Sequence, residues 1–436
     1  MKRAICKMTA DEAAQQIVSG QRLFITGNCS TPIPFVEALV RRYRELQNVE
    51  LVQVLSIGMR EYITADMSEH IHVNNLFISA NMRSAVNSGT ADFTPVFLSE
   101  IPALFRQGQL TPDVAVIHVS PPDEHGYCSY GVEVGVTKSA AESAKMVIAQ
   151  INPHMPRTLG DSFIHISKID YCIDVDDQLP EVKPSPASPV QDQVAQKIAD
   201  LIPNGATLQT GIGGIPDAVL RRLHDHKNLG IHTELFSDGV MEMIEAGVIT
   251  NAEKTIHAGK VIAGFVIGTQ KLYEYIHDNP VIELHPTEYV NDPFIIARND
   301  RMVSINSALE VDLTGQVCAD SIGTSFYSGV GGQVDFVRGA ARSKNGKSII
   351  ALPSTAKGGK VSRISPVLKE GAGVTTSRND VHFIATEYGV ADLFGKTIAQ
   401  RVQALISIAH PDFREQLAAA AREYYHVGRI FSALGV

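Results

Sequence analysis

The residues best suited to chemistry lie in the stretch 229–239, which reads Leu-Gly-Ile-His-Thr-Glu-Leu-Phe-Ser-Asp-Gly. This pattern predicts a short apolar strand that ends by presenting one carboxylate, Glu234, among polar neighbours. A carboxylate held in a desolvated site can act as a covalent nucleophile, and we predict that role for Glu234. His232 would share the same face of the strand. It could be a neutral hydrogen-bond partner, but we favour a purely structural histidine.

Two glycine-rich turns could hold a substrate against this carboxylate. The first, at 211–216, reads Gly-Ile-Gly-Gly-Ile-Pro and lies between a predicted strand and a predicted helix, where backbone N–H groups can bind a phosphate or an oxyanion. It lacks the third glycine of the dinucleotide-binding motif, and the alternative is a plain strand-to-helix turn. The second, at 328–333, has three glycines in four residues, which permits close approach of the backbone to a ligand.

Two further loops deserve a chemical interpretation. Lys357 stands among hydroxyls and glycines in the loop 353–360, which follows a predicted strand at 348–351. That loop could hold an anion, and the alternative is a solvated basic loop. Glu387 ends another predicted strand and is a rival nucleophile, although a salt-bridged structural role is the alternative that we favour. The chain has no metal-binding spacing of His and Cys, so we predict no metal site.

Composition excludes several classes of protein. The chain has 436 residues, 44% of them hydrophobic, which is typical of a globular enzyme with two domains. A net charge of −9 argues against a nucleic-acid partner. The longest apolar run, at 261–268, is far shorter than the roughly 20 residues of a membrane span, so we expect a buried strand there and no membrane. Five scattered cysteines and no visible signal peptide favour a cytoplasmic protein with reduced thiols.

Helical and strand patterns alternate from the beginning of the chain. A capping box at 9–12 starts a helix, and strands are expected at 23–25, 49–55 and 114–119, with a helix at 34–46. Such alternation predicts an α/β fold with mostly parallel sheets, covered by helices on both faces. Ligand contacts in such folds gather in the loops after the strands.

The chain contains an internal repeat on either side of a proline-rich stretch at 179–189. Prolines at this density favour an extended linker. Beyond it, Gly205 takes the place of Gly20, and Gly211 takes the place of Gly27. We therefore predict two homologous open α/β domains, residues 1–183 and 184–436, with the active site between them. The same alignment sets Glu234 opposite Gln53, so that only the second copy would carry the ionisable group.

Six segments in this order resemble the acetyl-CoA hydrolase/transferase family, and within it the 4-hydroxybutyrate and butyrate:acetate CoA-transferases. The resemblance covers almost the full length of the chain. Its carriers are Ser120–Gly126, Asn152–Arg157, Gly211–Pro216, His232–Glu234, Gly331–Phe336 and Pro353–Gly359. It implies a CoA-transferase-like fold in both domains and an enzyme that uses coenzyme A as a substrate, without a permanently bound cofactor.

The resemblance also implies roles for single residues. Glu234 stands at the position of the family's nucleophile. Our own mechanistic hypothesis adds that Gly331 and Gly332 would supply backbone N–H groups to an oxyanion. Contacts to CoA would come from Gly211, Ile212, Gly213, Gly214, Ile215, Ser328, Gly332 and Lys357. The expected reaction moves CoA between a short-chain acyl-CoA and a carboxylate such as acetate, through a glutamyl-CoA thioester. The alternative is an acyl-CoA hydrolase that uses the same glutamate. We also expect a homodimer.

Overall fold

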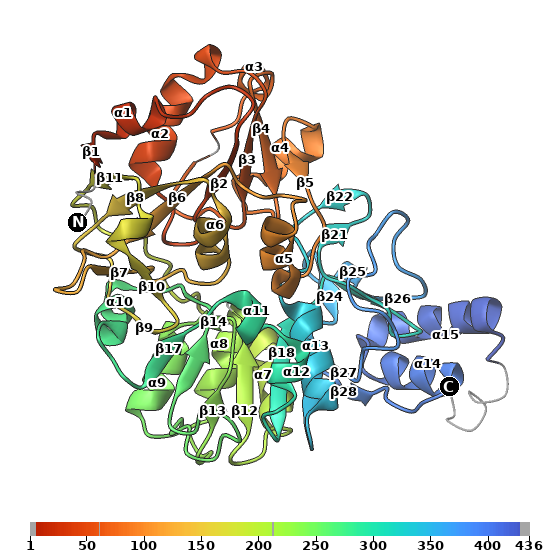
Figure 1. Ribbon diagram of the computed structural model, residues 1–436. Helices are drawn as coiled ribbons and strands as arrows, with labels where there is room; N and C mark the ends of the chain where they lie inside the picture. The colour runs from red at the N-terminus through yellow and green to blue at the C-terminus, as the bar shows by residue number, and fades with distance from the viewer. Residues whose placement is uncertain (1–5, 61, 212, 428–436) are drawn as a thin grey trace.

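The computed structural model describes residues 6–60, 62–211 and 213–427, and two twisted sheets organise it (Figure 1). The first sheet has eight strands, all paired in parallel. Their order across the sheet is β1 (Cys6–Met8), β11 (Tyr171–Asp174), β8 (Met146–Ile151), β6 (Val114–Val119), β2 (Arg22–Ile25), β3 (Val49–Gln53), β4 (Ile71–Asn75) and β5 (Asp92–Phe93).

Helices cover both faces of this sheet because successive side chains of a strand point to opposite faces. Leu23 and Ile25 of β2 pack into a core with Phe35, whereas Phe24 packs into a separate core with Phe105. The helices of this half are α1 (Ala10–Ala14), α2 (Ile33–Arg41), α3 (Ala65–Ser68), α4 (Arg83–Ser88), α5 (Ile101–Arg106) and α6 (Thr137–Ser143). The predicted capping box at the start of α1 and the predicted strand 114–119 are both confirmed.

The second sheet has six strands, parallel except for the last pair. Their order is β13 (Gly230–Ile231), β12 (Thr207–Thr210), β18 (Met302–Ser307), β23 (Lys347–Ala351), β27 (Phe383–Thr386) and β28 (Gly389–Asp392). Its helices are α7 (Pro189–Ala199), α8 (Gly214–Arg221), α9 (Asp238–Glu245), α10 (Gln270–Ile276), α11 (Thr287–Val290), α12 (Pro293–Ile296), α13 (Gln333–Arg342), α14 (Ile398–Ser407) and α15 (Pro411–Tyr425). The predicted α/β class with mostly parallel sheets is confirmed.

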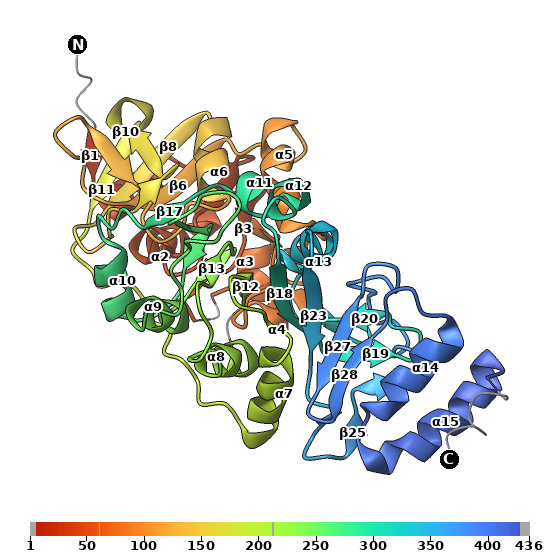
Figure 2. The ribbon, with the colours of Figure 1, turned by 90° about the horizontal axis from the view of Figure 1, so that it is seen from below.

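Figure 2 shows both halves from below, and short strands join them. In a three-stranded sheet, β9 (Leu159–Gly160) of the first half pairs with β17 (Ile282–Leu284), which pairs with β15 (Val261–Ala263). The chain between the halves, residues 175–188, contains no helix or strand. The predicted boundary at 183/184 falls in this segment and stays a prediction.

The two sheets repeat the same backbone pattern. The N–H of Gly20 donates to the carbonyl of Gln47 at 2.9 Å, and the N–H of Gly205 donates to that of Lys227 at the same distance. Asn48 and Asn228, the next residues along, both adopt a left-handed conformation, with φ of 53° and 55°. The next hydrogen bonds are also equivalent in the two copies. The N–H of Glu50 donates to the carbonyl of Gln21 in the first, and the N–H of Gly230 donates to that of Ala206 in the second.

That register corrects the expected counterpart of Glu234. The hydrogen bonds of the two strands make Asn228 the equivalent of Asn48, which is a spacing of 180 residues. When the same spacing is continued to Glu234, its equivalent is Val54 and not Gln53. Gln53 instead binds Asn75 and Tyr62 within the first half. The counterpart predicted from the sequence is therefore shifted by one residue relative to the hydrogen-bond register.

The stretch 229–239 also differs from the predicted single strand. Its residues form β13 in the six-stranded sheet and then β14 (Leu235–Phe236), which pairs with β16 (Phe265–Val266) in another sheet. Glu234 lies in the connection between them. The predicted strand 261–268 is likewise divided into β15 and β16. Both changes arise because the chain passes from one sheet to another, which periodicity does not report.

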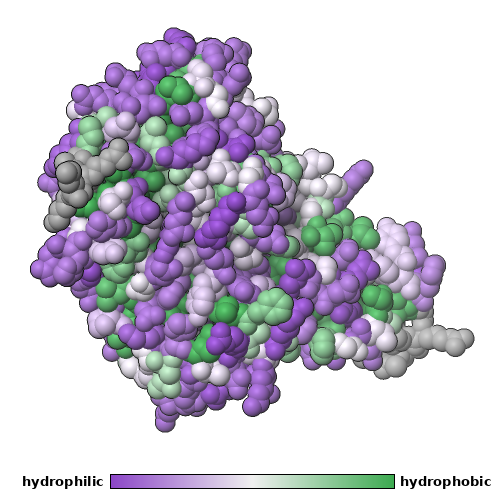
Figure 3. All heavy atoms as spheres, viewed as in Figure 1, coloured by the Kyte–Doolittle hydropathy of each residue, from purple (hydrophilic) through white to green (hydrophobic). Residues whose placement is uncertain are grey.

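Hydrophilic side chains cover much of the face in Figure 3, with apolar residues scattered among them. Within the described part of the chain, no helix combines the length and the apolar character that crossing a membrane requires.

Candidate active site

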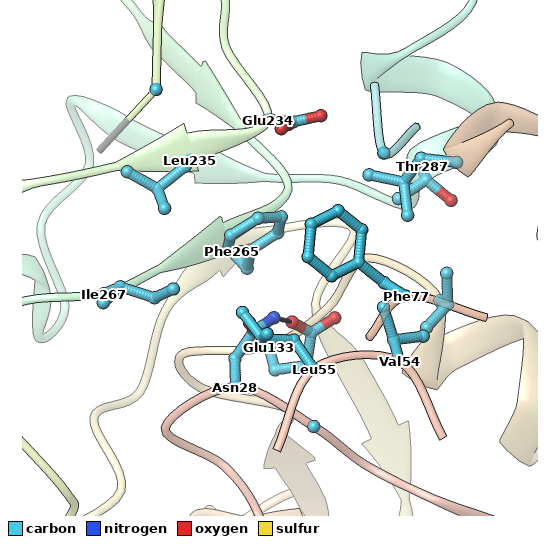
Figure 4. Close-up of a pocket in the computed structure, with 15 residues that line it drawn as sticks. Asn28, Val54, Leu55, Phe77, Glu133, Glu234, Leu235, Phe265, Ile267 and Thr287 are labelled. Carbon is cyan, nitrogen blue, oxygen red and sulfur yellow. Dashed lines mark hydrogen bonds between the residues drawn. The ribbon is translucent and has the colours of Figure 1, made fainter. Parts of the chain in front are cut away.

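A cavity of about 240 Å³ lies between the two halves and receives side chains from both (Figure 4). Most of its wall is apolar, and its polar side chains come from Asn28, Glu133, Glu234 and Thr287. The remaining residues that line it are Gly27, Val54, Leu55, Phe77, Leu98, Val136, Gly211, Leu235, Phe265, Ile267 and Gly331. Both members of the Val54–Glu234 pair therefore face the same cavity.

The connection between β13 and β14 holds Glu234 in place through its backbone. The carbonyl of Glu234 accepts hydrogen bonds from the N–H groups of Gly264 and Phe265, each at 2.9 Å. Thr233, one residue earlier, donates its N–H to Ile262 at 3.0 Å. The side chain of Glu234 is half-buried at the cavity wall (Figure 4). The carboxylate is thus fixed by the strands that join the two halves.

Two donors approach the carboxylate. The side-chain Nδ2 of Asn291 donates to Oε2 of Glu234 at 3.0 Å, and the N–H of Gly332 also donates to the carboxylate. Burial raises the pKa of Glu234, and these two hydrogen bonds oppose the rise because they stabilise the charged form. A partly desolvated carboxylate is a better nucleophile than a hydrated one, so the arrangement suits covalent catalysis.

Gly332 must be glycine to leave room for these groups. A Cβ atom at this position would lie 1.9 Å from Oε2 of Glu234 and 2.2 Å from Nδ2 of Asn291. The same residue caps the N-terminus of α13, where the helix dipole also favours a negative charge.

The turn before α13 is held by the first half of the molecule. The carbonyl of Gly331 accepts the N–H of Leu98 at 3.0 Å, and Asp335 accepts the hydroxyl of Ser99 at 2.8 Å. Burial raises the pKa of Asp335 to about 7, and the nearby charge of Glu234 adds to the rise. The position of the second glycine turn, and therefore of the Gly332 N–H, depends on contact between the two halves.

His232 and Glu387 have other roles. His232 is fully buried, and its Nε2 lies 2.8 Å from the carbonyl of Val290. Burial lowers its pKa to about 3, so it is neutral and structural. Glu387 does not line the cavity and accepts hydrogen bonds from the N–H and hydroxyl of Ser354. The predicted preference for Glu234 over Glu387 agrees with this placement.

Of the other predicted site residues, only some lie at the cavity that contains Glu234. Gly211 and Gly331 line the cavity, and Gly213, with φ of 119°, precedes α8, which begins with Gly214 and Ile215. Ser328 is half-buried in the second turn, whereas Lys357 lies on the exposed turn between β24 (Thr355–Ala356) and β25 (Val361–Ser362). Neither of these two lines the cavity. Ile212 lies outside the described residues.

Several residues of the site carry no strong sequence signal. Asn291, which binds Glu234, follows the short helix α11 and comes from 57 positions away. Asn28 and Glu133 meet across 105 positions. Nothing in the local pattern around these residues indicates that their side chains face a cavity.

Comparison with known proteins identifies the family. Residues 4–182 match the acetyl-CoA hydrolase/transferase N-terminal domain, and residues 268–421 match the acetyl-CoA hydrolase/transferase C-terminal domain. The chain belongs to the acetyl-CoA hydrolase/transferase family. It is 53% identical over 410 residues to a 4-hydroxybutyrate coenzyme A transferase of Clostridium kluyveri, which covers 94% of this chain and 96% of that protein.

Two further members of the acetyl-CoA hydrolase/transferase family support the same assignment. A butyryl-CoA:acetate CoA-transferase of Anaerostipes caccae is 39% identical, covering 94% of each protein. The crystal structure of a 4-hydroxybutyrate CoA-transferase from Porphyromonas gingivalis superposes with a TM-score of 0.83 at 44% identity, over 96% of this chain and 97% of that chain. The protein is a CoA-transferase.

Substitution of Gly332 by alanine should disable the site without unfolding the protein. The new methyl group would displace the carboxylate of Glu234 or the amide of Asn291, and we expect kcat to fall by about 10²-fold or more. Glu387→Gln is the control, because this carboxylate lies outside the cavity; its loss should be at least about tenfold smaller. Equal losses in the two variants, with unchanged circular dichroism, would contradict the assigned contact.

The pH dependence of the reaction should report the hydrogen bond from Asn291. As the predicted nucleophile, Glu234 must be ionised, so we expect kcat/KM to fall as the pH drops through the raised pKa of Glu234. Asn291→Ala removes a donor that lowers this pKa, and the acidic limb of the profile should move to higher pH. Glu387→Gln should leave the limb where it is. A limb that stays in place or moves to lower pH in Asn291→Ala would refute the assignment.

Proposed function

We propose that the enzyme transfers CoA from a short-chain acyl-CoA, of the 4-hydroxybutyryl or butyryl type, to a carboxylate such as acetate, by a ping-pong reaction through a glutamyl-CoA thioester on Glu234. The observation that carries the proposal is the carboxylate of Glu234, half-buried at the wall of a mostly apolar cavity and bound by two N–H donors. The names of the relatives support the substrate class.

In the first step, Glu234 attacks the thioester with the carboxylate oxygen that Asn291 does not bind. Asn291 binds Oε2, so we assign the attack on the thioester carbonyl to Oε1. The C–S bond breaks, CoA leaves as a thiolate, and Glu234 carries an acyl-glutamyl anhydride. Apolar residues such as Phe265 and Leu235 surround the acyl chain and exclude water, which protects the anhydride from hydrolysis.

The second step returns the thiolate to the glutamyl carbonyl. Oε2 becomes the oxyanion of this addition, and the Nδ2 of Asn291 and the N–H of Gly332 already bind the carboxylate there. Each such donor is typically worth about 10²–10³ in kcat. Collapse releases the first acid as its carboxylate and leaves the glutamyl-CoA thioester. A second carboxylate then reverses both steps, so one thioester replaces another and no other energy source is needed.

The proposed binding site for CoA draws on residues from several separate segments of the chain. We assign it to the first glycine turn with its helix start, Gly211 to Ile215, and to Ser328, Gly332 and Lys357, with Gly331 and Gly332 as donors near the reacting carbonyl. The position of Gly211 and Gly331 on the cavity wall supports this. A cytoplasmic location, favoured by five unpaired cysteines, and a homodimeric state complete the proposal.

Replacement of Glu234 tests the proposed function. Glu234→Gln keeps the size of the side chain but removes the nucleophile, and Glu234→Ala removes both; each should lower CoA transfer from butyryl-CoA to acetate by about 10⁴-fold or more. Glu387→Gln is the control and should retain transfer. Release of free thiol is measured in parallel without acetate. Full activity of Glu234→Gln would refute the nucleophile, and rapid thiol release without an acceptor would identify a hydrolase.

A further inference from the structure

The cavity has a second polar site across from Glu234. Asn28 and Glu133 line it on the opposite side in Figure 4, and the Nδ2 of Asn28 donates to Oε2 of Glu133. The mechanism proposed above uses neither residue. Both are almost completely buried, with exposed fractions of 4% and 3%. A buried amide and carboxyl in an otherwise apolar wall are costly unless they have partners.

The pair is not fully satisfied by the protein. The Oδ1 of Asn28 is buried and has no hydrogen-bond partner among the described residues. Glu133 is confined, because a Cβ atom on Gly135 would lie 2.7 Å from its Oε1. Burial raises the pKa of Glu133 to about 7, while hydrogen bonds from Asn28 and from the N–H of Val136 oppose the rise. The carboxyl can therefore be protonated near neutral pH, and it then donates a hydrogen bond. The pair therefore offers one acceptor and one donor.

The backbone fixes this pair relative to the nucleophile. Glu133 forms an antiparallel bridge with Phe265, and the N–H of Phe265 donates to the carbonyl of Glu234 at 2.9 Å. The N–H of Gly135 donates to Gly264 at 3.1 Å, on the same short segment. One piece of β-structure thus holds both polar ends of the cavity, with the apolar side chains of Phe265 and Ile267 along its wall.

We propose that Asn28 and Glu133 bind a hydroxyl group on the acyl chain, and that this pair makes the enzyme select hydroxyacyl-CoA over unsubstituted acyl-CoA and over dicarboxylic acyl-CoA. This inference rests on the proposed function, since it places the acyl chain in the cavity beside Glu234. A hydroxyl is both donor and acceptor, so it pairs with the Oδ1 of Asn28 and with the carboxyl of Glu133 together.

Other acyl chains match the pair less well. A methyl group leaves the buried polar atoms without partners, and sites of this kind reject an analogue that lacks the hydroxyl. A free carboxylate would need a countercharge in so dry a place. None of the described residues that line the cavity is Lys or Arg, so the site does not supply one.

The test compares kcat/KM for 4-hydroxybutyryl-CoA, butyryl-CoA and succinyl-CoA, with acetate as the acceptor. The wild type should prefer the hydroxyacyl substrate by about tenfold or more over each of the others. Glu133→Met keeps most of the volume and removes the polar group. Asn28→Gly removes the amide, and glycine accepts the φ of 52° at this position. In each variant the ratio of hydroxyacyl to acyl kcat/KM should fall by about tenfold.

Glu387→Met, which replaces a carboxylate outside the cavity, is the control and should keep the wild-type ratio. A wild type without preference would overturn the inference, and this result needs no variant to fold. Equal losses on both substrates in Glu133→Met and Asn28→Gly would also overturn it, because they would show a structural role. Absence of transfer from every acyl-CoA by the wild type would instead refute the proposed function.

Discussion

The proposed mechanism depends on keeping one carboxylate, that of Glu234, partly out of water while it stays ionised. Burial alone would favour the protonated acid, which cannot attack a thioester. The hydrogen bonds from Asn291 and from the N–H of Gly332 counter this effect without neutralising the charge. Neither donor brings a positive charge, which would lower the nucleophilicity of the carboxylate. The glycine at 332 follows from this requirement, since any side chain there would occupy the same space.

The two halves of the molecule meet around this carboxylate for a physical reason. One half supplies Glu234, Asn291 and the glycine turn, while the other supplies much of the apolar wall and the contacts from Leu98 and Ser99 that hold the turn. The two halves also share a repeated backbone pattern. At the 180-residue spacing of the repeat, Val54 in one copy and Glu234 in the other both line the cavity, and in the proposed mechanism only the second copy supplies a reacting group.

The sequence was sufficient for the features that depend on local patterns. Alternating helices and strands predicted the parallel sheets, and the composition of 229–239 and of the two glycine turns directed attention to Glu234 and Gly332. The division of 229–239 into β13 and β14 was missed, because a strand that changes sheets keeps its apolar pattern. Asn291 and the Asn28–Glu133 pair were missed because each acts through a partner distant in sequence. Such contacts are set by packing, which local propensity does not encode.

The covalent role of Glu234 is the central claim, and trapping the intermediate tests it most directly. The wild-type enzyme is incubated with butyryl-CoA in the absence of acetate, treated with borohydride, digested and examined by mass spectrometry. The account predicts that the peptide containing Glu234 carries the reduced side chain, an alcohol in place of the carboxylate, and only when acyl-CoA was present. An unmodified Glu234 under conditions in which transfer proceeds, or reduction at Glu387 instead, would contradict the account.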